Sequence, residues 1–236
     1  MLADLPITAQ AGRLVPEVQL PGTARYVLLD FVATELPRWR DHPDRQPEAS
    51  EQVLTAQLCS HLNGAARTCL SWVQFRTEVP DETRRGRAID LAPQPCGVIV
   101  NIEGRRHTQF NMLIPIECKR LPTPKEKDRD EREYVVTSTG TTGGIQRFKF
   151  GHHGAAHRVG AMIAYVQEKT FPYWLAQVNS WIRDLSAATD SAWSSSDRLK
   201  RVTDDPAAGL CTLISRHKRQ GDLSECELRH LWIKMN

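Results

Sequence analysis

Residues 110–121 read FNMLIPIECKRL, an apolar stretch that ends in alternating charged positions. The pattern predicts a β-strand, in which successive side chains point to opposite faces. Glu117 and Lys119 then share one face. The other face carries Phe110, Met112, Ile114, Ile116 and Cys118. An unpaired carboxylate at the end of such a strand is costly if it is buried, so Glu117 and Lys119 indicate either a functional site or an ordinary ion pair at the end of a strand.

Three shorter segments before this stretch, at 72–79, 87–92 and 98–103, also have the composition of strands. Together with 110–121 they predict one sheet of about four strands. Asp90 stands between two apolar residues in the second segment, so it is a second candidate for a functional carboxylate. Pro115 would remove a hydrogen-bond donor from a central strand, and we expect a local bulge there.

Helical spacing of apolar residues predicts three helices. The first begins at residue 51, with Ser50 as its N-cap and Gly64 as its end. The second covers 155–167 and the third 173–188, where Trp174 and Trp181 are expected to be core residues. Strands are predicted at 210–216 and 228–234. This order predicts a single α/β domain with a mixed sheet flanked by helices.

The first third of the chain has an excess of acidic residues, and the remainder has an excess of basic residues. Residues 1–83 contain 7 Lys and Arg against 11 Asp and Glu, whereas 84–236 contain 24 against 17. The basic excess downstream of Glu82 is compatible with a polyanionic partner. Residues 1–47 form a lead segment that belongs to the domain or packs on it, and Pro37, Pro43 and Pro47 predict a loop or linker at its end.

Several classes of protein are not expected from this sequence. No apolar run approaches the roughly 18 residues that a transmembrane helix needs, and the N-terminus lacks the features of a secretory signal. The six cysteines show no metal-binding or disulfide spacing, so reduced thiols and a cytoplasmic location are expected. His152, His153 and His157 have no third ligand at matching spacing, which disfavours zinc.

Two carboxylates at the ends of adjacent strands can bind Mg²⁺, which prefers oxygen ligands. The cation can acidify an attacking water, while Lys119 can neutralise charge that develops on a phosphate. With Glu51 at the start of the first helix, Asp90, and the run IPIECKRL over 114–121, the chain resembles the PD-(D/E)xK, or restriction-endonuclease-like, nuclease superfamily. The resemblance covers residues 48–168, and it implies that 48–236 form a nuclease domain with a C-terminal helix and hairpin.

The resemblance also implies roles for individual residues. Asp90, Glu117 and the backbone carbonyl of Cys118 would bind Mg²⁺, for which Mn²⁺ can substitute. Lys119 would assist the attacking water. Glu51 would complete the water shell of the metal, with Glu48 as the competing residue for that role. The reaction implied is the hydrolysis of phosphodiester bonds by an endonuclease, with DNA favoured as substrate.

Nucleic acid would be bound largely through its phosphates. We expect contacts from Arg87, Arg120, Arg147 and Arg158, with Arg84, Arg85, Gln146 and Lys149 as further candidates. Residues 144–148 and the following segment resemble compact bacterial nucleases found beside phage-defence genes. That resemblance implies an effector of anti-phage defence, controlled by an ATPase, helicase or sensor or by assembly into a homo-oligomer. The alternative is a catalytically inactive nucleic-acid-binding or scaffolding module of the same fold.

Overall fold

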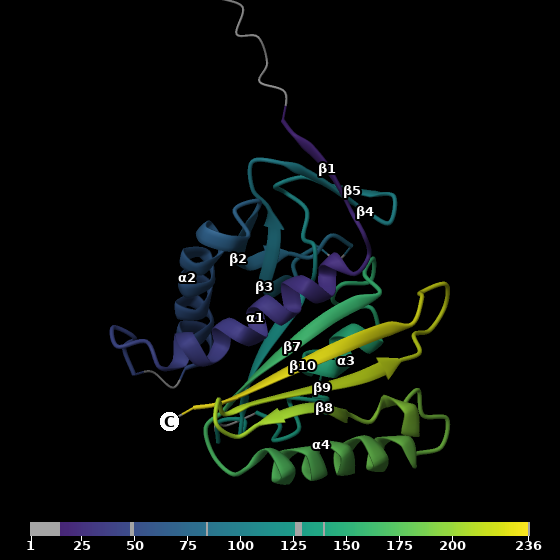
Figure 1. The fold of residues 1–236 in the computed structure, drawn as a ribbon. Helices are drawn as coiled ribbons and strands as arrows, with labels where there is room; N and C mark the ends of the chain where they lie inside the picture. Colours follow the sequence, from purple (N-terminus) through teal and green to yellow (C-terminus); the bar gives the residue numbers. More distant parts are fainter. Residues whose placement is uncertain (1–14, 48–49, 84, 126–128, 139, 236) are drawn as a thin grey trace, which may run out of the picture.

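The computed structural model describes residues 15–47, 50–83, 85–125, 129–138 and 140–235 (Figure 1). Glu48 and Arg84 therefore lie outside the described residues. A seven-stranded mixed sheet forms the centre, with the strand order β2-β3-β6-β7-β10-β9-β8. Its strands are β2 (Val73–Pro80), β3 (Ala88–Pro95), β6 (Ile116–Leu121), β7 (Val159–Val166), β10 (Cys226–Lys234), β9 (Leu210–His217) and β8 (Lys200–Asp205).

A second, three-stranded sheet consists of β1 (Glu17–Leu20), β4 (Ile99–Ile102) and β5 (Arg105–His107). The helices are α1 (Ala24–Arg40), α2 (Glu51–Cys69), α3 (Gly144–Lys149) and α4 (Phe171–Ser186), with a 3-10 helix η1 (Ser195–Asp197). The four segments predicted as strands of one sheet all contain strands, but β4 belongs to the small sheet while β2, β3 and β6 lie in the large one. The prediction of a mixed sheet flanked by helices is confirmed. None of the described helices has the length and apolar character needed to cross a bilayer.

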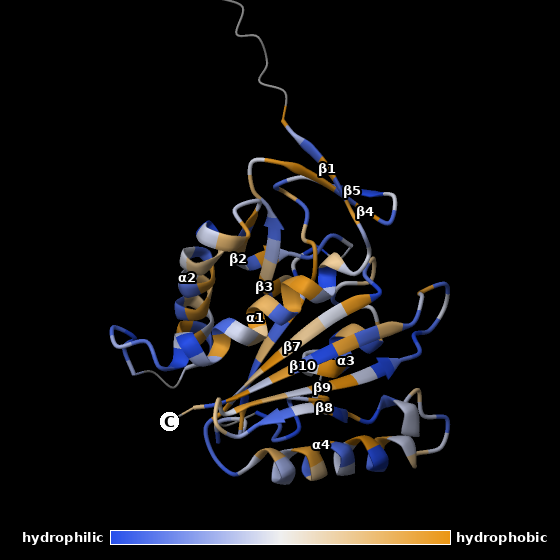
Figure 2. Ribbon diagram, in the orientation of Figure 1, coloured by the Kyte–Doolittle hydropathy of each residue, from blue (hydrophilic) through white to orange (hydrophobic). Residues whose placement is uncertain are grey.

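Two apolar cores lie on opposite faces of the large sheet. One packs α1 and α2 against Cys118 and Ile163, and the other packs α3 and α4 against Met162 and Ala164. Figure 2 shows the corresponding apolar colouring along β7, β9 and β10, whereas β8 at the sheet edge is largely hydrophilic. Trp174 and Trp181 are buried in the second core, as predicted for packing residues.

β7 corrects the helix predicted at 155–167. All eight residues of this strand are buried, because it runs parallel to β6 on one side and to β10 on the other. A strand that is covered on both faces is apolar throughout, and its periodicity cannot be distinguished from that of a buried helix.

The end of α2 differs from the prediction, and α1 was not predicted. Ser50 caps α2 by accepting a hydrogen bond from Val53 N at 3.3 Å, as expected. The helix continues through Gly64 to Cys69, because Leu62 and Ala66 on either side of the glycine are buried in the first core. Pro37 lies inside α1 and not in a loop, near the C-terminal end, where one lost hydrogen bond is tolerated.

The strand that carries the candidate site is shorter than expected. β6 begins at Ile116, so the preceding residues do not alternate as predicted, and Phe110 is 76% exposed. Pro115 stands just before the strand, where its carbonyl accepts a hydrogen bond from Ala161 N at 3.0 Å. The predicted bulge is therefore unnecessary.

Candidate active site

The geometry of β3 and β6 places Asp90 beside Glu117. These antiparallel strands pair at Leu91 and Ile116 in the described residues. Asp90 precedes Leu91 and Glu117 follows Ile116, so antiparallel pairing sets the two carboxylates opposite each other. The strands then diverge, and Asp90 Oδ2 accepts a hydrogen bond of 2.8 Å from Cys118 N. The side chain of Asp90 thus accepts the hydrogen bond from Cys118 N that a backbone carbonyl of the neighbouring strand would otherwise accept.

Lys119 joins this strand pair to the first turn of α2. Its Nζ lies 2.9 Å from Glu51 Oε1 and 3.3 Å from Glu117 Oε1. Glu51 Oε2 also accepts a hydrogen bond from Arg120 N at 3.2 Å. Burial acts to lower the pKa of Lys119, but the charges of nearby carboxylates outweigh it and hold this pKa well above its ordinary value. Lys119 is therefore a buried, permanently charged ammonium.

Glu117 is fully buried and surrounded by cations. Arg147 on α3 contacts Oε1, and His153 Nδ1 lies 3.1 Å from Oε2. Burial acts to raise the pKa of Glu117, yet Lys119, the hydrogen bond from His153 and Arg147 together lower the pKa to about 2. Glu117 therefore carries its charge throughout the neutral range.

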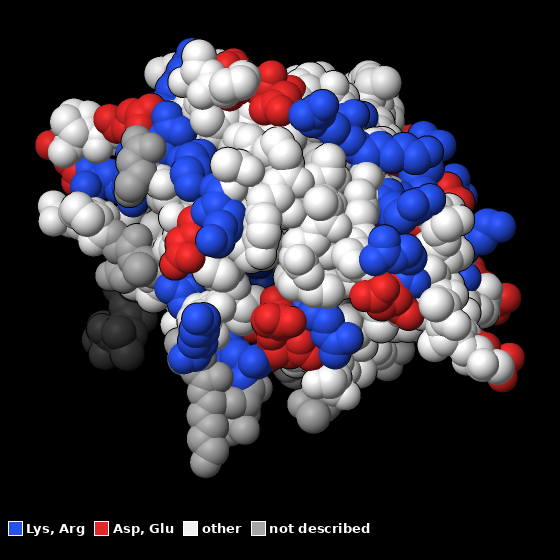
Figure 3. Space-filling model, turned by 90° about the horizontal axis from the view of Figure 1, so that it is seen from below, with Lys and Arg blue, Asp and Glu red and all other residues white. Residues whose placement is uncertain are grey.

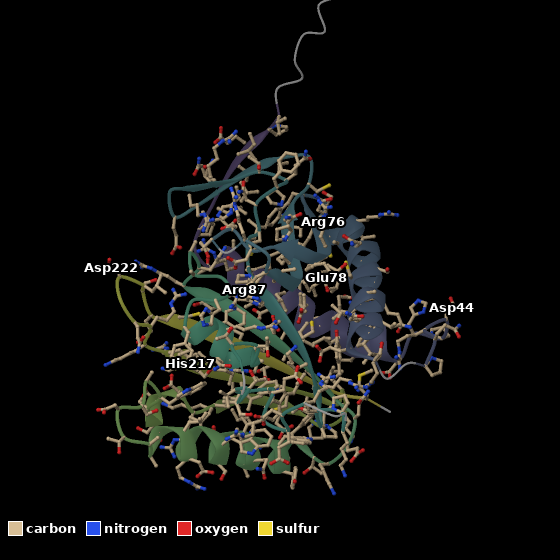
Figure 4. The ribbon with its side chains drawn as sticks, turned by 180° about the vertical axis from the view of Figure 1, so that it is seen from behind. Asp44, Arg76, Glu78, Arg87, His217 and Asp222 are labelled. Carbon is tan, nitrogen blue, oxygen red and sulfur yellow. The ribbon has the colours of Figure 1, made fainter. Side chains whose placement is uncertain are left out.

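Asp90 has the opposite electrostatic character. Burial and the charge of Glu117 raise its pKa to about 8, although Lys119 and the N–H of Cys118 act in the other direction. Part of the side chain faces a cleft of about 360 Å³, which is lined by residues of α2, β2 and β3 that include Glu51, Thr55 and Glu78. Figure 4 shows Glu78 on β2 beside α2. Strongly shifted carboxyls in a cleft are typical of functional sites.

The structure distributes the predicted arginines over different environments. Arg147 points at Glu117, and Arg87 donates a hydrogen bond of 2.9 Å to Thr141 Oγ1. Arg120 is partly buried beside the site. Arg158 is exposed just before β7 and lines a separate hollow that also contains Arg25 and Arg216.

Two further predictions are corrected by the same region. Lys149, a candidate phosphate contact, is 2% exposed and bonds to Asp197, so it is not accessible to a polyanion. His157, which falls in the helix predicted at 155–167, does not lie on a helix; it contacts Glu82, and His153 contacts Glu117. The six cysteines, all among the described residues, form no disulfide, as predicted.

Sequence reasoning did not assign Arg147 and His153 to Glu117. Arg147 is 30 residues from Glu117 and His153 is 36 residues away, and no motif links them. Glu78 was also missed, since an acid in an exposed strand position is ordinary. Within the described part of the chain, no group of three or more His, Cys, Asp or Glu side chains is arranged to hold a metal.

Comparisons with protein-family models, with curated proteins and with solved structures find no match for this chain.

Proposed function

We propose that this protein is a Mg²⁺-dependent endonuclease that hydrolyses phosphodiester bonds, with DNA as the favoured substrate. One observation carries the proposal: Asp90 and Glu117 stand opposite each other on diverging strands, and Lys119 contacts both Glu117 and Glu51. The elements around the site are α2 and the neighbouring strands β2, β3 and β6 of the large sheet; along the chain, β4 and β5 of the small sheet come between β3 and β6. The helix and these three strands resemble the core of the PD-(D/E)xK nucleases.

The donor set suits a hard divalent cation. Asp90 and Glu117 offer carboxylate oxygens, and the carbonyl of Cys118 offers a third, which are the ligands that Mg²⁺ and Mn²⁺ accept. Burial and then the charge of Glu117 raise the pKa of Asp90, so the charged form of Asp90 is unfavourable in the protein alone. A cation beside the two carboxylates would stabilise both in the charged form. When bound, it would act as a Lewis acid on a phosphate oxygen and on water.

The other residues have supporting roles in this proposal. Lys119 holds a permanent positive charge where charge develops on the phosphate. Glu51 orients Lys119 through the 2.9 Å contact. Arg147 and His153 orient Glu117 and keep it ionised. Regulation by a partner protein and a place in anti-phage defence stay predictions from the resemblance.

One observation favours the alternative of an inactive nucleic-acid-binding module. Both carboxylate oxygens of Glu117 are already engaged, one by Arg147 and Lys119 and the other by His153. A metal ligand must offer a free lone pair, so Mg²⁺ would have to bind beside these contacts or displace one of them. The two functions therefore differ in whether Mg²⁺ binds and phosphodiester bonds break.

The deciding experiment incubates the full chain with supercoiled plasmid DNA and Mg²⁺ or Mn²⁺. Asp90→Asn and Lys119→Met should each reduce nicking at least about 100-fold, since each removes a charge that acts in the transition state. Asp222→Asn is the matched control, because Asp222 is an exposed acid on the β9–β10 turn (Figure 4). Nicking that is equal in wild type and Asp90→Asn would overturn the proposal. Binding without nicking would support the inactive module.

A further inference from the structure

A basic groove lies at the opposite end of the large sheet from β3. It has a volume of about 440 Å³ and contains four cationic side chains and one carboxylate. The cations are Arg198, Lys200, Arg216 and Lys218, and the acid is Glu225. Figure 3, which views the molecule from below, shows Lys and Arg side chains gathered along its right-hand side, toward η1 and the β9–β10 turn.

The groove forms where β8 begins. The first residue of β8, Lys200, pairs with Ile214, so the remainder of β9, up to His217, continues without this neighbour. Arg198 and Lys200 are two residues apart on one wall, and Arg216 and Lys218 are two residues apart on the other. Alternation along an extended chain turns each pair of side chains to the same side. The four cations therefore form two short rows and do not converge on one point.

Most of this positive charge has no internal partner. Arg216 makes a salt bridge of 3.2 Å with Glu227. Arg198, Lys200 and Lys218 are exposed, and over the described ranges none of the three makes a salt bridge. Such a concentration of unpaired like charge is unfavourable for the isolated protein and attracts an anionic partner.

Buried ion pairs and hydrogen bonds hold the two walls of the groove in place. Buried Asp197 precedes Arg198, and its carboxylate binds Lys149 Nζ at 2.9 Å and His217 Nδ1 at 2.7 Å. Lys149 also donates to the carbonyl of Lys218 at 3.2 Å. Both walls are thus tied to the same buried ammonium, so binding would cost little ordering entropy.

We propose that this groove binds the sugar-phosphate backbone of duplex DNA, as an anchoring surface separate from the candidate active site. Two residues of an extended strand span about 6.7 Å, so each wall carries its two cations in a line along the groove. Two parallel rows of cations therefore match an extended polyanion better than a single small anion. The neighbouring hollow that contains Arg158 shares Arg216 and Glu225 with this groove, but its three arginines are balanced by three glutamates, so the basic surface is confined to the groove.

The choice of DNA rests on the proposed function, but the test separates the two. The full chain is titrated into a fluorescently labelled random-sequence duplex in EDTA, so that no cleavage occurs, at several salt concentrations. The groove variant carries Arg198→Ala, Lys200→Ala and Lys218→Ala. Each lost phosphate contact should reduce the slope of log affinity against log salt by about 1, so we expect a reduction of about 3 and an affinity at least about tenfold lower.

The matched control removes three exposed arginines elsewhere, through Arg38→Ala, Arg67→Ala and Arg106→Ala, and should leave the slope nearly unchanged. Circular dichroism and the unfolding midpoint verify that both variants are folded. Equal slopes for wild type and the groove variant would overturn the proposal, and so would loss of binding to polyglutamate but not to DNA. If the groove variant loses binding while Asp90→Asn binds normally and neither wild type nor variant cleaves DNA, the groove stands and the nuclease does not. If instead Asp90→Asn abolishes cleavage and the groove variant binds DNA as tightly as wild type, the nuclease stands and the groove does not.

Discussion

Two buried charged clusters lie on either side of α3, and they differ in charge balance. The first contains Glu117, Lys119 and Asp90, with Arg147 reaching in from α3. The second contains Asp197, which binds Lys149 of the same helix and His217. α3 therefore contributes one cation to each cluster, two residues apart.

The second cluster is closed. Asp197 accepts from Lys149, and His217 Nε2 continues to Ser215 Oγ at 2.7 Å, which in turn lies 2.8 Å from His230 Nε2. His230 Nδ1 then meets the hydroxyl of Tyr134 at 2.7 Å, and that hydroxyl accepts from Trp232. Burial holds the pKa of His230 well below its ordinary value. The hydrogen-bonded residues that follow His217 in this network are therefore uncharged. A satisfied network of this kind rigidifies a core.

The first cluster is open. Its Asp90 carboxyl faces a cleft and has a pKa raised to about 8, because burial and Glu117 oppose its charge. A closed network contributes to the fold, whereas an open one with an uncompensated carboxyl is suited to bind a cation. Charge balance and access to a cleft distinguish the two clusters, since both consist of similar residue types at similar depth.

The largest effect is expected from opening the closed cluster. Asp197→Ala leaves Lys149 buried without its carboxylate partner, and removal of one partner of a buried ion pair costs about 3–5 kcal/mol. Urea unfolding of the variant should show this loss. The double variant Lys149→Met with Asp197→Leu should recover part of it, because no charge is then left uncompensated. An Asp197→Ala protein as stable as wild type would contradict the distinction between the clusters.

The next effect concerns the pH dependence that Asp90 confers. Its folded pKa is raised above the unfolded value of about 3.9, so its contribution to stability is fully present below that value and is lost as the pH rises through about 8. Wild type should therefore lose stability relative to Asp90→Asn between pH 5 and pH 9, by up to about 4 kcal/mol. Thermal unfolding at both pH values measures this difference.

Thermal unfolding in the presence of Mg²⁺ tests whether a cation binds at Asp90. A cation that binds Asp90 favours its charged form, so addition of Mg²⁺ at pH 9 should raise the melting temperature of wild type and not that of Asp90→Asn. If Mg²⁺ raises the melting temperatures of the two proteins equally, any bound cation lies away from Asp90. The open cluster then has a structural role only.

The smallest effect is expected from interrupting the neutral end of the closed cluster. Ser215→Ala removes the hydroxyl between His217 and His230 and leaves one ring nitrogen on each without its partner, at a cost of about 1–2 kcal/mol. Ser60→Ala on the exposed face of α2 is the control, expected to change stability by less than about 0.5 kcal/mol. DNA nicking by Ser215→Ala should equal that of wild type. A selective loss of nicking would link the two clusters functionally.

Local features of the chain predicted a large part of this structure. The cap at Ser50, the apolar stripe of α4 and the turn between β9 and β10 all follow from residues that are close in sequence. The alternation of Glu117 and Lys119 also placed them on one face before any tertiary contact was known, and the two indeed meet at 3.3 Å. β7 was mistaken for a helix because its apolar run reflects burial between β6 and β10, which is not a local property.

The sequence by itself determined which residues could form a charged site at the end of β6 and that Asp90 could join it. Only the tertiary structure decided that Arg147 and His153 engage Glu117, that Lys149 is buried under Asp197, and that Arg198 and Lys218 meet in one groove. The physical reason is the range of the interactions. Strand alternation and helix capping act over a few residues, whereas ion pairing and burial depend on which distant segments the sheet brings side by side.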